Sequence, residues 1–232
     1  MSNPLYVSPY FSEPVELIGL YGPRGDYPIV KDLLSWVANY IKRLVATDNQ
    51  AIIMITGAPG SGKSTLALGL IKLLDSDFKL DDVYIYSNND IKRKLKDNNP
   101  QRINLFDEGS VTLNSLATTS KEGRYLSMFF DTMRSRHYIS IICVPDGSDI
   151  QGRIAKHVNL YLECPKKAPL PGYSARGFFH CKKRTVYKSG KKWDDLIATG
   201  VFKPLPKKLK TEYEKKKKEK QDEFIDKMLE DD

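Results

Sequence analysis

Nine consecutive residues in the first third of the chain have the types and spacing needed to bind phosphate groups, and they fit the pattern G-x-x-x-x-G-K-[ST]. In order, they are Gly57, Ala58, Pro59, Gly60, Ser61, Gly62, Lys63, Ser64 and Thr65. Glycines let backbone N–H groups turn inward around phosphates, at a helix N-terminus whose dipole favours anions. Lys63 is expected to reach the β- and γ-phosphates, and the Ser64 hydroxyl to bind Mg²⁺. These residues therefore predict a binding site for a nucleoside triphosphate.

The segments on both sides of this loop are those that the motif requires. Ala51–Ile55 before it is a short apolar run, as in a buried parallel strand, and Leu66–Leu74 after it has the composition of a helix. An ordinary glycine turn between a core strand and a core helix is the alternative. The Lys-Ser pair and the two flanking elements favour the phosphate-binding loop, or P-loop.

An acidic pair follows a second apolar run. Residues Arg102–Glu108 read as a short strand ending in Asp-Glu, the Walker B pattern. Asp107 is expected to hold Mg²⁺ opposite Ser64, and Glu108 to act as the general base that orients and deprotonates the attacking water. Strands often end in acidic turns, which is the alternative. The position downstream of a P-loop, with one strand–helix unit between, favours Walker B.

Two arginines, Arg134 and Arg136, lie between an expected helix and the apolar run Ile139–Val144. One of them is a candidate arginine finger, which would stabilise the charge on the γ-phosphate bound by a neighbouring subunit. The alternative is that they neutralise the C-terminus of a helix. The sequence leaves these two interpretations open.

The composition limits the class of protein. The 232 residues are enough for one domain with its own core plus extensions, and the formal net charge of +8 favours a polyanionic partner such as DNA. Much of the charge lies between Lys166 and Lys220, so a lysine-rich solvated surface is an equal alternative. The three cysteines are widely spaced and form no C-x-x-C pair, so a zinc site is not expected.

The chain has no apolar run near the roughly 18 residues needed to span a bilayer. Residues 1–19 also lack the charged and apolar regions of a secretory signal. Together with the cysteine pattern, this predicts a cytoplasmic protein without a membrane segment.

The order of apolar runs predicts an α/β fold, a P-loop NTPase three-layer sandwich with a mostly parallel sheet. We expect an N-terminal extension over residues 1–30, a P-loop ATPase domain over residues 31–202 and a charged helical tail over residues 203–232. In the tail, a helix is predicted from Lys207 to about Leu229. It is either a solvated helix docking by its two ends or a contact for nucleic acid or a protein partner. Further strands are expected at Val83–Ser87, at Val158–Leu162 and, as one broken strand or two short ones, over Phe178–Tyr187.

Several segments together resemble a known class of ATPases. A strand between the P-loop and Walker B matches the additional-strand, catalytic-glutamate (ASCE) class. Within it, the layout is similar to the FtsK/HerA-type ATPases and to DnaA-like ATPases of archaeal viruses and plasmids, over about Ile52–Leu162. The segments that carry the resemblance are the P-loop, Leu105-Phe106-Asp107-Glu108-Gly109, and the helix ending Arg134-x-Arg136 that leads into Ile139–Val144 and Val158–Leu162. One departure is that FtsK/HerA proteins typically end the fourth strand with a polar sensor, where this chain has Val144-Pro145-Asp146.

The resemblance implies an Mg²⁺-dependent ATPase that forms a homo-oligomeric ring and couples ATP hydrolysis to DNA replication, loading, packaging or transfer, in an archaeal virus or another mobile element. One alternative is a kinase for a nucleoside or other small molecule, although the Ser/Thr-rich residues 111–123 and the Asp-Glu pair argue against it. The other is a nucleotide switch that does not hydrolyse ATP and uses the tail as a binding arm.

Overall fold

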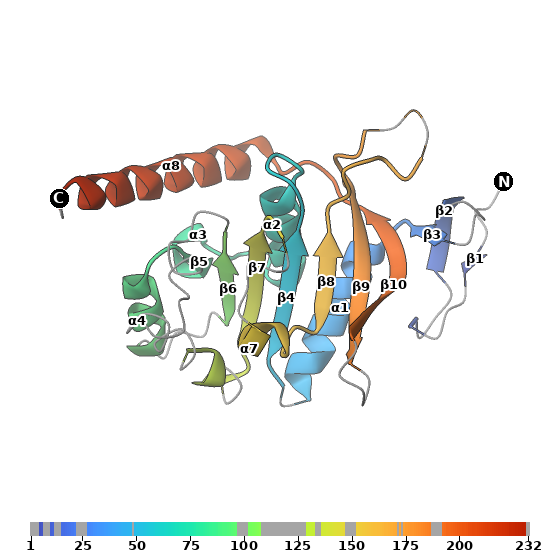
Figure 1. Cartoon of the computed structure of the whole chain (residues 1–232), viewed down its shortest axis with the longest axis horizontal. Helices are drawn as coiled ribbons and strands as arrows, with labels where there is room; N and C mark the ends of the chain where they lie inside the picture. Colours follow the sequence, from blue (N-terminus) through green and yellow to red (C-terminus); the bar gives the residue numbers. More distant parts are fainter. Residues whose placement is uncertain are drawn as a thin grey trace.

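The computed structural model describes residues 5–6, 10–11, 15–21, 27–47, 49–96, 102–107, 129–132, 136–146, 152–170, 172, 174–186 and 192–230. Within these residues, ten strands form one sheet in the order β1-β2-β3-β10-β9-β8-β4-β7-β6-β5. Figure 1 shows this sheet with helices packed against it and one long helix, α8, extending away from it.

Five neighbouring strands, all parallel, form the half of the sheet that carries the P-loop. They are β8 (Leu160–Glu163), β4 (Ala51–Thr56), β7 (Ile139–Val144), β6 (Ile103–Phe106) and β5 (Tyr84–Ile85). Every residue of β6 and β7 is buried, as expected for parallel strands covered on both faces. This is the predicted α/β fold with a mostly parallel sheet.

One parallel strand separates the P-loop strand from the Walker B strand. That strand is β7, which pairs with β4 on one side and with β6 on the other. The strand that lies between the two motifs in the sequence, β5, is instead at the edge of the sheet, beyond β6. A strand therefore does separate the two motif strands in the sheet, but it is β7 and not the strand that was predicted between the motifs in the sequence.

The other half of the sheet is mixed. β9 (Phe178–Val186) is antiparallel to both β8 and β10 (Lys192–Val201), and β3 (Tyr27–Val30) is parallel to β10. β2 (Val15–Tyr21) and β1 (Leu5–Tyr6) complete that edge. β9 is one continuous strand rather than a broken one, and β10 was not expected from the sequence. Since β3 pairs with β10, part of the predicted N-terminal extension continues the central sheet; the domain boundaries stay a prediction.

Apolar side chains fill both faces of the sheet. On one face, α1 (Leu33–Ala46) and α2 (Lys63–Leu74) pack against each other and against β4. On the other face, a second core contains Phe129 and Phe130, together with Ile154 from the short helix α7 (Gly152–Ala155). α3 (Leu80–Val83) and α4 (Asn88–Lys96) lie near the β5 edge (Figure 1). Alternate residues of β4 therefore contribute to two different cores.

The charged tail forms α8 (Lys207–Glu230), a single helix of 24 residues that agrees with the sequence prediction. It passes over the carboxyl end of β6, where Tyr213 contacts Asp107, and its far end extends outward beyond α3 and α4 (Figure 1). None of the helices in the described part of the chain has the length and apolar composition needed to cross a bilayer.

Candidate nucleotide-binding site

The P-loop connects β4 to α2 and is fixed by the ends of two neighbouring strands. The Gly57 N–H donates a 3.3 Å hydrogen bond to the Pro145 carbonyl after β7, and the Cys164 N–H donates one of 2.8 Å to the Thr56 carbonyl. α2 begins directly after Gly62, whose φ of +102° is a conformation that other residues rarely adopt. The sequence therefore places a helix N-terminus at the end of the loop, as an anion site requires.

Lys63 lies inside this loop rather than in solvent. Only 3% of its surface is exposed, and its Nζ donates hydrogen bonds of 2.7 Å to the Gly57 carbonyl and 3.1 Å to the Ala58 carbonyl. The loop thus holds the ammonium group at its centre, where the phosphates of a nucleotide would be surrounded by backbone N–H groups.

Ser64 and Asp107, the two predicted metal ligands, are in contact. The Ser64 hydroxyl donates a 3.1 Å hydrogen bond to Asp107 Oδ1, and Asp107 is completely buried at the end of β6. A hydroxyl and a carboxylate oxygen are ligands that suit Mg²⁺, which in phosphate sites takes one or two protein ligands and completes its shell with phosphate oxygens and water. Among the described residues, no group of three or more His, Cys, Asp or Glu side chains could hold a metal ion. The residues present therefore fit Mg²⁺.

Of the three remaining predicted residues, the structure describes only Arg136. Glu108 and Arg134 lie outside the described residues. Arg136 precedes β7, whereas the P-loop lies at the opposite, carboxyl end of that strand. Six residues of strand span about 20 Å. Arg136 is thus remote from the P-loop of its own chain, and a role as arginine finger is open to it only between subunits.

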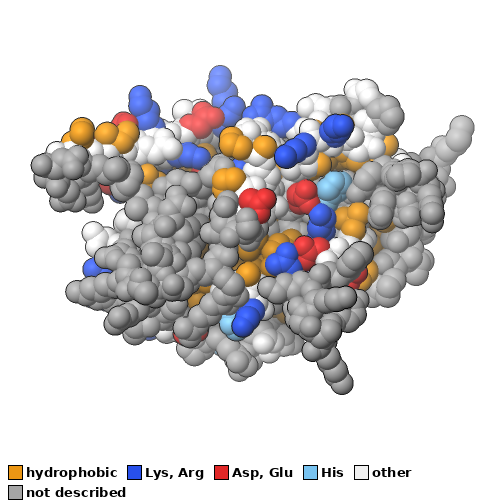
Figure 2. Space-filling view, in the orientation of Figure 1, with side chains coloured by type: hydrophobic (Ala, Val, Ile, Leu, Met, Phe, Trp, Pro, Cys, Tyr) orange, Lys and Arg blue, Asp and Glu red, His pale blue; other side chains and the backbone are white. Residues whose placement is uncertain are grey.

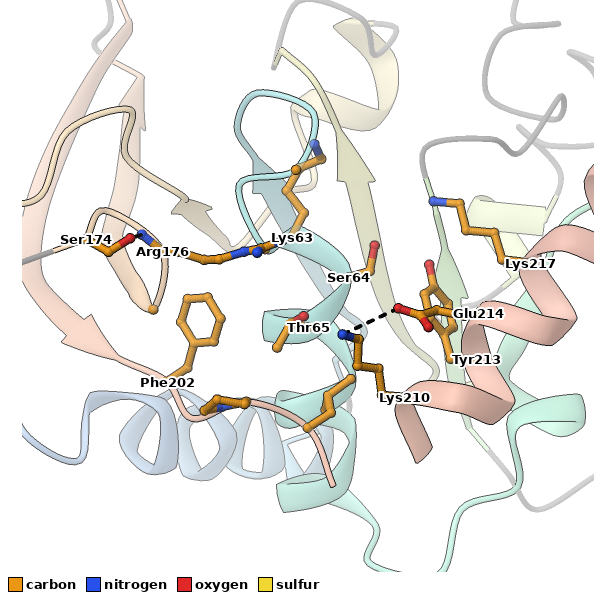
Figure 3. A pocket seen from close by; sticks show the side chains of 15 residues that line it. Lys63, Ser64, Thr65, Ser174, Arg176, Phe202, Lys210, Tyr213, Glu214 and Lys217 are labelled. Atoms are coloured by element: carbon orange, nitrogen blue, oxygen red, sulfur yellow. Dashed lines mark hydrogen bonds and ion pairs between the residues drawn. The ribbon is translucent and has the colours of Figure 1, made fainter. Parts of the chain in front are cut away.

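A cavity of about 640 Å³ opens beside the start of α2, and its second wall comes from residues far along the chain (Figure 3). The Arg176 side chain extends toward the P-loop, and the Phe202 ring lies beneath it. A Cβ atom placed on Gly62 would lie 3.1 Å from that ring, so loop and ring are in close contact. The lining residues of the second wall are Ser174, Arg176, Gly177, Phe202, Pro204, Leu205, Lys210, Tyr213, Glu214 and Lys217.

Two residues of α8 reach Asp107. The Tyr213 hydroxyl donates a hydrogen bond to Asp107 Oδ2, and Lys217 Nζ donates one of 2.9 Å to the same oxygen. Burial, and then the nearby charge of Asp107, raises the pKa of Tyr213, so its hydroxyl keeps the proton that it donates. Sequence reasoning missed this part of the site, because Tyr213 lies within the predicted charged helix, Phe202 lies just before the predicted tail, and neither belongs to a recognisable motif.

The sheet order, the P-loop and the contact between Ser64 and Asp107 are typical of P-loop NTPases. In agreement, residues 38–143 match the family model described as Novel STAND NTPase 3. This segment runs from α1 to β7 and includes the P-loop and Asp107, but neither β9, β10 nor α8. The match supports the predicted NTPase; it does not extend to the FtsK/HerA-type or DnaA-like ATPases of archaeal viruses. No curated protein sequence is significantly similar to the chain.

Proposed function

We propose that this protein is an Mg²⁺-dependent ATPase of the STAND type. The observation that supports it best is the 3.1 Å hydrogen bond between Ser64 and Asp107 at the start of α2, because it joins the two oxygen ligands of a metal–phosphate site. Residues Gly57–Thr65 would hold the triphosphate. When bound, Mg²⁺ would neutralise charge on the phosphates.

The buried Lys63 would turn from the carbonyls of Gly57 and Ala58 toward the β- and γ-phosphates. Glu108 follows Asp107 directly, which supports its proposed role in orienting and deprotonating water at the γ-phosphate. Lys63 thus binds and orients the substrate, and Glu108 moves the proton.

The second wall of the cavity suits the rest of a nucleotide. Phe202, Pro204 and Leu205 offer an apolar surface beside the P-loop, against which a flat base can stack. Arg176 adds a positive charge near the loop (Figure 3). The cavity volume of about 640 Å³ is within the range of small-molecule sites.

The test is ATP binding and hydrolysis with and without Mg²⁺, in the wild type and in Lys63→Ala. Lys72→Ala is the matched control, because Lys72 is an exposed lysine on the same helix. We expect Mg²⁺-dependent release of orthophosphate that is lost in Lys63→Ala and retained in Lys72→Ala. Equal ATP binding by the wild type and Lys63→Ala would contradict the proposal. Transfer of phosphate to an added acceptor, without orthophosphate release, would favour a kinase instead.

We further propose that ATP hydrolysis is coupled to DNA binding, because the first part of α8 carries a large excess of positive charge. From Lys207 to Lys220 the chain has eight lysines and three glutamates, and Lys and Arg side chains gather along the edge where α8 lies (Figure 2). DNA should stimulate hydrolysis, and replacing the exposed Lys207 and Lys208 by Gln should weaken that effect. The exposed Lys72 and Lys79, replaced in the same way, serve as controls. Hydrolysis that is indifferent to single- and double-stranded DNA would contradict the coupling.

Assembly into a homo-oligomer is proposed from the position of Arg136, at the end of β7 opposite the P-loop. If Arg136 or Arg134 acts as an arginine finger at the site of a neighbouring subunit, mixing Lys63→Ala with the variant of that arginine (Arg136→Ala or Arg134→Ala) should restore part of the lost ATPase activity. This follows because mixed rings contain some interfaces with both residues intact. Oligomers that form from such mixtures without any recovery would exclude both arginines as fingers.

A further inference from the structure

Two side chains near the start of α8 contact the carboxylate of Asp107, which is the proposed ligand of Mg²⁺. Asp107 Oδ2 accepts hydrogen bonds from Tyr213 and, at 2.9 Å, from Lys217, while Oδ1 accepts one from Ser64. Both oxygens of this buried carboxylate are therefore bonded by side chains of the protein. Figure 3 shows Tyr213 and Lys217 projecting from α8 toward Ser64.

The docked end of α8, residues Lys207–Lys217, is held by a small set of side chains. Tyr213 is 6% exposed, and its ring meets that of Tyr84 edge-on with the centroids 6.0 Å apart. Lys216 forms an ion pair with Asp81 of α3. Tyr213, Lys216 and Lys217 thus connect α8 to β5, to α3 and to the end of β6.

Beyond this end, most of the side chains that the structure describes in α8 are exposed. Ile225 and Leu229 show 53% and 71% of their surface to solvent, so these two side chains bury little apolar area. The hydrogen bonds and the ion pair described above, which attach α8 to the rest of the chain, all lie in its first three turns. A ligand that competes for Asp107 acts directly on that attachment.

We propose that α8 is a nucleotide-controlled arm: Tyr213 and Lys217 hold it on Asp107 when the site is empty, and binding of Mg²⁺ with a nucleoside triphosphate releases it. The proposal rests on the proposed function. Mg²⁺ needs an oxygen of Asp107 as a ligand, and the ammonium of Lys217 beside the same carboxylate would repel the metal ion. Docking of α8 and binding of Mg²⁺–nucleotide therefore oppose each other, and each weakens the other by the same factor.

The family match does not account for this contact. The matched segment ends at residue 143, whereas the two α8 residues that contact Asp107 are Tyr213 and Lys217. The contact thus adds a second element, 106 positions away in the sequence, to the NTPase site.

The first experiment measures the affinity of the full chain for a fluorescent ATP analogue with Mg²⁺. Tyr213→Phe keeps the ring against Tyr84 and removes the hydroxyl, and Lys217→Gln removes the charge. Lys218→Gln is the control, because Lys218 is an exposed lysine one position further along the helix. We expect the double variant to bind Mg²⁺–nucleotide about tenfold more tightly than the wild type, as the loss of about two competing hydrogen bonds predicts. Lys218→Gln should match the wild type.

The second experiment follows α8 itself by hydrogen exchange of the full chain. Mg²⁺ with a slowly hydrolysed ATP analogue should speed exchange over Lys207–Lys217 in the wild type, and the nucleotide with EDTA should not. In the double variant, exchange there should already be fast without nucleotide. These changes do not depend on turnover.

The outcomes separate the two proposals. If the wild type binds nucleotide through Lys63 but the double variant binds equally or more weakly and α8 keeps its protection, the nucleotide-controlled arm is wrong and the ATPase stands. If neither the wild type nor the double variant binds nucleotide, the proposed function itself fails, and the arm with it. Binding by the double variant alone would support both.

Discussion

The Ser64 hydroxyl lies 3.1 Å from Asp107 Oδ1 and donates a hydrogen bond to it, although the two residues are 43 positions apart in the sequence. β7 sets this geometry, because it is the single strand between β4 and β6. Two strand spacings of about 4.8 Å separate β4 from β6, and the short side chains of Ser64 and Asp107, which follow these strands, meet across that gap. β7 thus sets a distance between β4 and β6 at which the two predicted metal ligands, Ser64 and Asp107, can contact each other.

Replacing Asp107 by Asn tests whether this pair binds Mg²⁺. The amide keeps the size of the side chain but loses the charge that the metal needs. In the wild type we expect nucleotide affinity to rise when Mg²⁺ is added; in Asp107→Asn that gain should fall by at least about tenfold. Titration calorimetry with and without EDTA measures it. Asp77→Asn, at an exposed position after α2, is the control. A full Mg²⁺ effect in Asp107→Asn would remove this residue from the metal site.

Replacing Glu108 by Gln separates binding from hydrolysis. Gln keeps the size of the side chain but does not accept a proton from water. ATP affinity should therefore remain close to the wild-type value, while steady-state turnover falls by about 100-fold or more. Filter binding of labelled ATP, together with an assay for orthophosphate, measures both quantities. Normal turnover in this variant would exclude Glu108 as the general base.

Elements with a strong local signal were predictable. The strand Ile139–Val144 was predicted with both of its ends, because a strand covered on two faces is a continuous apolar run bounded by polar or turn residues. Likewise, α8 begins at Lys207, directly after Pro206, as predicted. The P-loop was predictable for the same reason, since its residues are neighbours in the sequence.

β10 could not be predicted in this way. It contains Asp194 and Asp195, which are uncommon in strands. Its stability there comes partly from a partner on the neighbouring strand: Arg184 of β9 donates hydrogen bonds of 2.6 and 2.8 Å to the Asp194 carboxylate. This pair also lowers the pKa of Asp194, first through the hydrogen bond. A local pattern does not reveal a cross-strand partner ten positions away.

The same limit applies to the site. Gly57–Thr65 and Asp107 carried recognisable motifs, and the structure brings them together. Phe202 and Tyr213 belong to no recognisable motif. They line the cavity because the chain after β10 returns to the surface beside the P-loop. An aromatic residue before a proline-rich linker, or within a charged helix, has no spacing that identifies a binding wall.

Gly200 in β10 should be sensitive to a single methyl group. A Cβ atom there would lie 2.5 Å from the Phe179 ring and 2.9 Å from Leu33 Cβ, inside the core between the sheet and α1. We expect Gly200→Ala to lower the free energy of unfolding by about 1–3 kcal/mol, as overpacking does. Urea denaturation measures it. Gly19→Ala is the control, since its Cβ would be 3.8 Å from the nearest atom. Equal stability of the two variants would contradict the packing between β10 and α1.

The contact between Gly62 and Phe202 predicts how the P-loop responds to substitution. At Gly62, φ is +102° and a Cβ would lie 3.1 Å from the Phe202 ring; at Gly60, φ is +75° and no atom lies within 4 Å. Both alanine variants carry backbone strain, of order 1–3 kcal/mol, but only Gly62→Ala also pushes against the second wall of the cavity. Gly62→Ala should therefore weaken nucleotide binding more than Gly60→Ala does.

A double-mutant cycle isolates that contact. In a Phe202→Ala background, the ring is absent, so Gly62→Ala should lose the part of its effect that comes from the clash and approach the effect of Gly60→Ala. Affinity for a fluorescent ATP analogue, measured for the single and double variants, gives the coupling. Because Phe202 is also the proposed stacking surface for the base, Phe202→Ala alone should weaken binding of ATP more than binding of inorganic triphosphate. If Gly62→Ala had the same effect with and without the ring, Phe202 would not act on the P-loop at all.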